Sequence, residues 1–236
     1  MSRACFFLMT CVLTVLMAAG AMAETRVLTF DSNNWGTSPF GTYNTTKSFQ
    51  SDNGNPGACV LFRGIGGVGG SFANAGFTGD FAAAGFDRIS FDIKKKHWFL
   101  RPNNQMPRAF MFVQKQGCWP WKKEIQNFDP MASGYKNYFV NFDPNWTDSQ
   151  AQAEGWSLRT DYGTADTASF SDTMHNVMRT GFWIQEMAPA ECHVYVDNWK
   201  LGPAGLQFAP MRQPIKMQPA PGVKPSTKQR YPIKKK

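Results

Sequence analysis

The stretch Arg88-Ile89-Ser90-Phe91-Asp92-Ile93-Lys94 decides the fold class, because apolar and polar side chains alternate along it without a break. Successive side chains of a β-strand point to opposite faces, so this period of two predicts a strand with one buried face. Seven further segments are short, apolar or alternating, and bounded by Gly, Pro, Asn and Asp clusters, which predicts strands for them as well. These segments are residues 27–30, 58–62, 109–113, 138–142, 156–159, 182–185 and 194–199.

Eight short strands separated by turn residues predict an all-β fold, an antiparallel β-sandwich of jelly-roll type. One helical turn is expected at residues 171–178, with Ser171 or Asp172 as its N-cap. Residues 64–69 read G-x-G-x-x-G, the pattern of a dinucleotide site, but the residues after them would not sustain the helix that must hold the pyrophosphate. We therefore interpret this run as a flexible loop between strands.

The first 23 residues have the features of a secretory signal peptide. Arg3 supplies the positive start, residues 4–19 are apolar, and Ala21-Met22-Ala23 forms a small-x-small cleavage site before Glu24. No other apolar run approaches the roughly 18–20 residues of a membrane helix, so no integral membrane segment is expected. The chain is therefore expected to be secreted, periplasmic or at the cell surface, which argues against nucleotide-dependent metabolism in the cytosol.

The net charge of +8 is concentrated at the C-terminus. Residues 203–236 carry eight basic residues, seven prolines and no acidic residue, whereas residues 24–202 carry 16 basic and 17 acidic residues. This division predicts one folded domain, residues 24–202, and a disordered basic tail, residues 203–236. The tail is expected to attach to an anionic cell-surface or matrix polymer, because an unfolded polycation needs no complementary shape. Nucleic acid is not expected as a partner, since no folded basic patch supports it.

Three cysteines remain after the signal peptide, which is enough for one disulfide in an oxidising compartment. Cys59 lies in the apolar segment 58–62 and is expected to be buried in a strand. Cys118 and Cys192 lie at expected loop positions, so we predict a disulfide between these two. The sequence leaves the other two pairings open.

Four motifs follow one another between about residues 75 and 202. They are Gly76-Phe77-Thr78-Gly79-Asp80-Phe81 ahead of residues 89–93, then Trp156 ahead of residues 170–177, then Phe182-Trp183-Ile184-Gln185, and finally Val194-Tyr195-Val196-Asp197-Asn198-Trp199. In this order they resemble a laminin B-type domain and, more broadly, galactose-binding-like jelly rolls. The resemblance implies a jelly-roll sandwich from extracellular matrix and carbohydrate-binding settings, without implying a ligand by itself. It also implies a structural Ca²⁺ where the first and last strands meet, with Asp31 and Asp197 as candidate ligands.

Aromatic residues are the most informative chemical feature, because sugar rings present apolar faces that stack on indoles. The chain has eight tryptophans. Trp119-Pro120-Trp121-Lys122-Lys123 places two indoles and two cations in an expected loop, and strand parity places Trp183 and Gln185 opposite the core-facing Phe182 and Ile184. We therefore predict Trp119, Trp121, Trp183 and Gln185 as ligand-binding residues. The same parity assigns two further aromatic residues to the non-core face, Tyr195 and Trp199.

These features favour an exported, non-catalytic carbohydrate-binding protein that binds a polysaccharide or other glycan. The alternative is a structural or adhesion protein of the envelope or matrix. Catalysis has less support: His97, with Arg101 and Arg108 nearby, is the set that would fit a polysaccharide lyase. Asn44 and Asn145 lie in glycosylation sequons.

Overall fold

The computed structural model describes residues 25–30, 37–39, 45–98, 107–130, 132–160, 165–185 and 191–204, which form an antiparallel β-sandwich. Sheet A consists, in order, of β3 (Thr46–Gly54), β4 (Gly57–Ile65), β12 (Glu191–Gly202), β6 (Arg88–Trp98) and β9 (Lys136–Asn141), with β1 (Arg26–Leu28) also paired to β12. Sheet B consists, in order, of β10 (Trp156–Leu158), β8 (Trp121–Glu124), β7 (Arg108–Lys115), β11 (Val177–Gln185), β5 (Gly67–Phe72) and β2 (Thr37–Pro39). Every pairing between these strands is antiparallel. The predicted all-β fold class is confirmed, and each of the eight predicted segments lies in or overlaps a strand.

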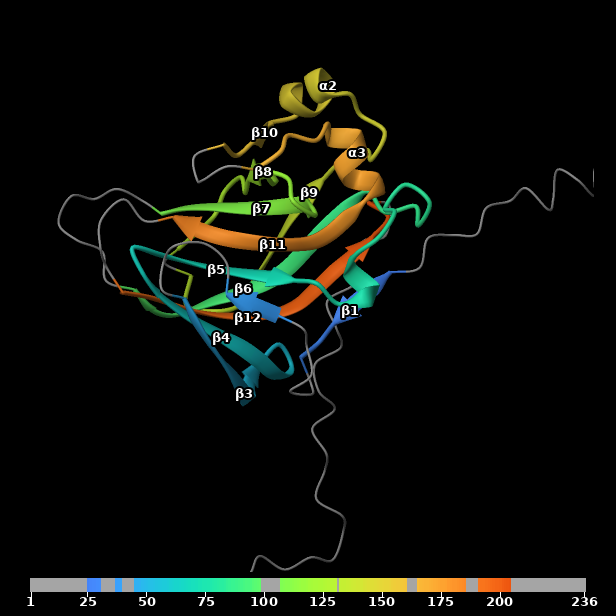
Figure 1. Cartoon of the computed structure of the whole chain (residues 1–236). Helices are drawn as coiled ribbons and strands as arrows, with labels where there is room; N and C mark the ends of the chain where they lie inside the picture. Colours follow the sequence, from blue (N-terminus) through green and yellow to red (C-terminus); the bar gives the residue numbers. More distant parts are fainter. Residues whose placement is uncertain are drawn as a thin grey trace, which may run out of the picture.

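Within the described residues, three short helices lie between the strands, and two of them lie next to each other above sheet B in Figure 1. The 3₁₀ turn η1 (Ala75–Phe77) follows β5, α2 (Asp148–Ala153) precedes β10, and α3 (Phe170–His175) precedes β11. The predicted helical turn exists as α3, but its N-cap is Ser169, whose hydroxyl accepts the N–H of Asp172 at 3.1 Å. Helix α2 was not predicted, although Thr147 and Gln150 form a capping box that marks its start.

Aromatic rings from both sheets fill the space between them. Phe72 from sheet B stacks on Trp199 from sheet A at a centroid distance of 4.3 Å, and Phe91 stacks on Phe182 at 5.3 Å. The rings of all four residues are buried. Because ring pairs contribute beyond the area they bury, this stack links the two sheets across the core.

The prediction of a flexible glycine loop at residues 64–69 is wrong, because most of these residues belong to strands β4 and β5. Only Gly66, with φ +75°, makes a turn there, and it carries the chain from β4 of sheet A to β5 of sheet B. All six residues of β5 are buried. A Cβ at Gly70 would lie 2.7 Å from the Phe62 ring, so glycine is needed there for close packing rather than for flexibility.

The prediction that Trp199 lies on the non-core face is wrong, because β12 contains a β-bulge before this residue. The β6–β12 register shifts between Asp197 and Lys200, and Asn198 takes a left-handed φ of +50°. Such a bulge adds a residue on one strand and reverses the face to which the following side chains point. Tyr195 therefore lies on the outer face as predicted, with Cys59 and Leu61, whereas Trp199 lies in the core and donates its indole N–H to Thr180 at 3.0 Å.

In the part of the chain that the structure describes, no helix has the length and apolar character needed to cross a membrane.

Candidate functional site

The outer face of sheet B carries an aromatic cluster formed by Phe110, Phe112 and Trp183. In β11, Phe182 and Ile184 pack in the core between the sheets, so Trp183 points to the opposite face, as strand parity predicts. Its ring lies 5.2 Å from Phe110 and 5.5 Å from Phe112, both on the neighbouring strand β7. This aromatic cluster of sheet B is separate from the main core.

Basic side chains cover the aromatic cluster. The Arg159 guanidinium lies 4.7 Å from the Trp183 ring centroid, and Lys122 lies 5.2 Å from Phe110 and 5.8 Å from Trp183. Arg108 lies 5.2 Å from Phe110. Cations over ring faces are attracted by the ring quadrupole, so the rings hold these donors in place. The rings are buried, with Trp183 only 2% exposed, and Arg159 is buried with them, whereas Lys122 is half-buried and Arg108 is exposed.

Arg108 is held further by Glu124 of β8. Its Nε donates to Oε1 of Glu124 at 2.8 Å, and its Nη2 donates to Oε2. This bidentate pair raises the pKa of Arg108 and lowers that of Glu124, because each charge stabilises the other. Gln185 lies directly opposite Arg108 in the β7–β11 ladder and is exposed, so an amide and a guanidinium lie side by side.

One of the four predicted ligand-binding residues, Trp121, does not reach this surface. Trp121 packs in the main core, perpendicular to Phe170 at 5.3 Å, and donates its indole N–H to the carbonyl of Ala168 at 3.0 Å. Trp119 is half-buried, and its backbone N–H donates to Asp166 at 2.9 Å. Residues 121–124 form strand β8 rather than part of a loop, which turns Trp121 inward and Lys122 outward. Trp121 is therefore corrected from a ligand contact to a core residue.

Sequence reasoning missed Phe110, Phe112, Lys122 and Arg159 as members of this face. The signal for Phe110 and Phe112 was present, since they alternate with the core residues Ala109, Met111 and Val113. No local pattern places Arg159 over Trp183, because sheet pairing brings them together.

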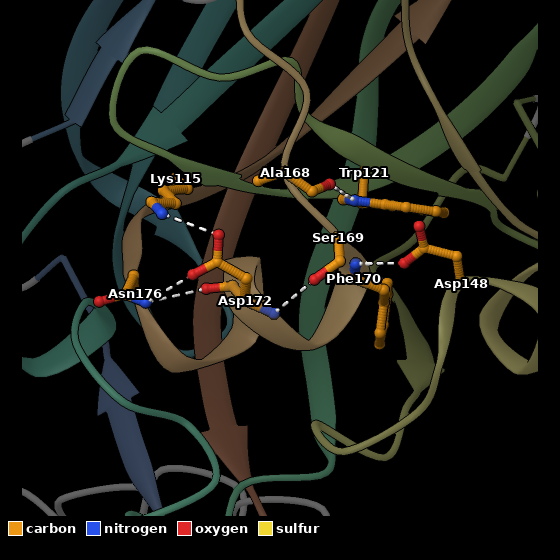
Figure 2. A network of polar contacts seen from close by, with 8 residues as sticks. All are labelled: Lys115, Trp121, Asp148, Ala168, Ser169, Phe170, Asp172 and Asn176. Atoms are coloured by element: carbon orange, nitrogen blue, oxygen red, sulfur yellow. Dashed lines mark hydrogen bonds and ion pairs between the residues drawn. The ribbon is translucent and has the colours of Figure 1, made fainter.

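A hollow of about 630 Å³ beside α3 is lined by polar groups, but its charged side chains are paired. Figure 2 shows Asp172 between Lys115 and Asn176: its carboxylate lies 2.8 Å from Nζ of Lys115 and accepts from Nδ2 of Asn176 at 3.0 Å. The ion pair raises the pKa of Lys115 and lowers that of Asp172. His175 likewise lies 3.1 Å from Asp80. The Lys115 pair anchors α3 to β7 of sheet B, and the His175 pair anchors it to the segment after η1, which are structural roles.

Asp197, a predicted calcium ligand, is completely buried and holds the β3–β4 turn against β12. Its Oδ2 accepts the N–H of Asn55 at 2.5 Å, and its Oδ1 accepts the N–H of Asn198 at 2.7 Å. Asp31 lies outside the described residues. Within the described ranges, no three His, Cys, Asp or Glu side chains gather with the geometry of a metal site. The calcium site stays a prediction.

The predicted disulfide is not found. Cys118 follows β7 of sheet B, whereas Cys192 lies in β12 of sheet A, and both are buried thiols. Cys59 is buried as predicted, and desolvation raises the pKa of its thiol to about 11. None of the three is bridged in the structure.

Two of the residues considered for a lyase, His97 and Arg108, lie on different sheets. His97 lies in sheet A beside His193, with ring centroids 5.6 Å apart, whereas Arg108 lies on the outer face of sheet B. Arg101 lies outside the described residues.

Comparison with solved structures finds carbohydrate-binding modules. The family 11 module of the cellulosomal cellulase Lic26A-Cel5E of Clostridium thermocellum superposes with a TM-score of 0.51 at 17% identity, over 78% of this chain and 97% of that one. The chain has the jelly-roll fold of these modules. A family 11 module from the same organism, in complex with a β-1,3-1,4-mixed-linked tetrasaccharide, gives a TM-score of 0.50 at 18% identity, over 78% and 98% of the two chains.

An exo-β-agarase also matches, with a TM-score of 0.50 at 12% identity, and this chain covers 26% of its length. No protein-family model and no curated protein sequence matches the chain. At these identities the likeness establishes the fold. It supports the broader resemblance to galactose-binding-like jelly rolls, while the laminin B-type assignment stays a prediction.

Proposed function

We propose that this protein is an exported carbohydrate-binding module without catalytic activity, and that it binds a polysaccharide on the outer face of sheet B. The aromatic cluster covered by Lys122, Arg159 and Arg108 carries this proposal. Its support is chemical: sugars require hydrogen-bond donors and acceptors held in fixed positions, and stacking on the rings fixes these side chains. The structural neighbours are themselves carbohydrate-binding modules, one of them in complex with a tetrasaccharide.

The ligand is expected to contact the basic surface and the exposed amide of Gln185, rather than the buried indole of Trp183. Guanidinium and ammonium groups donate to hydroxyl oxygens and, more strongly, to carboxylate or sulfate oxygens. Acidic polysaccharides are therefore expected to bind this face more tightly than neutral ones.

Substitution of Lys122 or Gln185 by alanine is expected to weaken polysaccharide binding. Each change removes one donor from the surface, which corresponds to a loss of roughly three- to tenfold in affinity. Isothermal titration of the full chain with neutral and acidic polysaccharides measures this loss. Lys96→Ala is the matched control, because Lys96 is exposed on sheet A and its removal changes the net charge equally. Equal affinities for Lys122→Ala and Lys96→Ala would place the ligand elsewhere.

The basic tail, residues 203–236, is proposed to add electrostatic attachment to an anionic polymer of the envelope or matrix. Its eight basic residues face no acidic residue within the segment, so its binding is expected to fall as salt rises. Deleting residues 203–236 is expected to lower the salt-sensitive binding to acidic polymers, while sheet B keeps its own affinity. A truncated chain that binds no glycan, with loss of attachment to the cell surface, would favour a structural or adhesion protein instead.

A further inference from the structure

A second hollow, separate from the aromatic cluster, lies where the two sheets approach at the side of the sandwich. It has a volume of about 470 Å³ and lies along β9, the edge strand of sheet A, facing β8 of sheet B and the turn at Asn127. Sites for small ligands have volumes of about 300–1,000 Å³, so this edge groove is large enough to hold one. In Figure 1, β8 and β9 both lie below α2.

Phe139 gives the edge groove an exposed aromatic ring. Its side chain is 50% exposed, in contrast to the buried rings of the aromatic cluster. The Arg88 guanidinium lies 4.6 Å from the ring centroid and limits its movement. A fixed, exposed ring can stack on the apolar face of a sugar.

Two amides flank Phe139 on the same face of β9, since residues 137, 139 and 141 alternate with the buried Tyr138 and Val140. Asn137 uses its Nδ2 group to donate to Asp92 at 2.7 Å and to the carbonyl of Phe91 at 3.4 Å, which leaves its Oδ1 to accept from a ligand. Asn141 accepts from Arg88 at 2.8 Å through its Oδ1, which leaves its Nδ2 group to donate. One acceptor and one donor thus lie on the two sides of the ring, an arrangement that suits sugar hydroxyls, which both donate and accept.

The charges of the edge groove differ from those on the outer face of sheet B. Among the described residues that line it, Lys123 and Glu154 carry opposite charges, and the carboxylate of Glu124 is already paired with Arg108. The lining thus has no excess of positive charge to attract a carboxylate or sulfate, whereas a neutral sugar needs none.

We infer that the edge groove is a second carbohydrate subsite that takes a neutral sugar unit, with Phe139 stacking on the sugar ring and Asn137 and Asn141 bonding to its hydroxyls. This inference rests on the proposed function, since a subsite extends a module that binds glycans. On this inference the outer face of sheet B binds acidic polymers, and the edge groove binds neutral ones.

The test is titration of the full chain with neutral β-glucan and agarose oligosaccharides in high salt, which suppresses binding through the tail. Phe139→Ala is expected to lower the affinity about tenfold or more, because truncating an aromatic anchor removes most of a small contact, and Asn141→Ala is expected to lower it roughly three- to tenfold, because it removes one donor. Ile65→Ala is the matched control, since Ile65 is 57% exposed on β4, away from the groove. Thermal unfolding of each variant checks that the fold is intact.

Three outcomes are distinct. Loss of affinity in both groove variants, with Ile65→Ala unchanged, supports the subsite. Binding of the neutral sugars by Phe139→Ala and Asn141→Ala as tightly as by the native chain overturns the subsite and leaves the proposed function intact. Failure of the native chain to bind any neutral or acidic glycan overturns the proposed function, and the subsite with it.

Discussion

The substitution Gly181→Ala is expected to destabilise the protein by about 3 kcal/mol, a large part of the roughly 5–15 kcal/mol that stabilises a domain. Gly181 lies in β11 between β5 and β7. A Cβ there would lie 2.3 Å from the carbonyl oxygen of Gly70 and 2.4 Å from the ring of Phe112. The first contact is with backbone, so relief requires the β5–β11 ladder to separate. The second contact would displace Phe112 from the aromatic cluster.

Urea denaturation followed by tryptophan fluorescence measures this effect as a shift of the midpoint. Gly134→Ala is the matched control, because no atom lies within 4 Å of a Cβ at that position. Its free energy of unfolding is expected to stay within about 0.5 kcal/mol of the native value. Equal midpoints for the two variants would mean that β5 and β11 do not pack as closely as described.

The substitution Asp197→Ala is expected to cost roughly 2–5 kcal/mol, because it removes the acceptor of the buried N–H of Asn198 and of the partly buried N–H of Asn55. Asp197 lies directly opposite Asp92 in the β6–β12 ladder, and loss of one of two facing carboxylates offsets part of this cost. The net effect is still a loss, since each carboxylate oxygen of Asp197 accepts a backbone N–H. The β3–β4 turn is expected to separate from β12 first.

Asp129→Ala is the matched control for this change. Asp129 pairs with Lys136 on the surface, so its loss is expected to change the free energy of unfolding by less than about 1 kcal/mol. The Asp197 variant also tests the calcium prediction. If Asp197 holds Ca²⁺, a chelator lowers the unfolding midpoint of the native chain and leaves that of Asp197→Ala unchanged. The same chelator response in both chains would remove Asp197 from the metal site.

The pattern of apolar and polar residues was enough to predict most of the strands, because a strand with one buried face has apolar side chains on that face and polar ones on the other. Alternation placed the strand at β6, short apolar runs bounded by turn residues placed β7 and β11, and strand parity turned Trp183 to the outer face. It failed for β5, whose six residues include three glycines and are all buried, so that no polar face remains to alternate with the apolar one. It failed at Trp199 because a single bulge at Asn198 reverses the parity beyond it.

The candidate site was harder to predict than the fold, because its members meet only through pairing between strands distant in the sequence. Arg159 reaches Trp183 across β8 and β7, and no local spacing encodes that contact. The edge groove likewise depends on β8 and β9 coming together, although the alternation of Asn137, Phe139 and Asn141 with buried neighbours is visible once β9 is known.

The length of the edge strands of sheet B affects the tendency of the protein to aggregate at high concentration. Its two margins are β10 and β2, each of three residues. A long, flat margin offers unpaired N–H and C=O groups as a template for another chain, and such short strands offer very little of one. A protein that accumulates on a polymer surface reaches high local concentrations there. Short edge strands such as β10 and β2 oppose edge-to-edge aggregation at such concentrations.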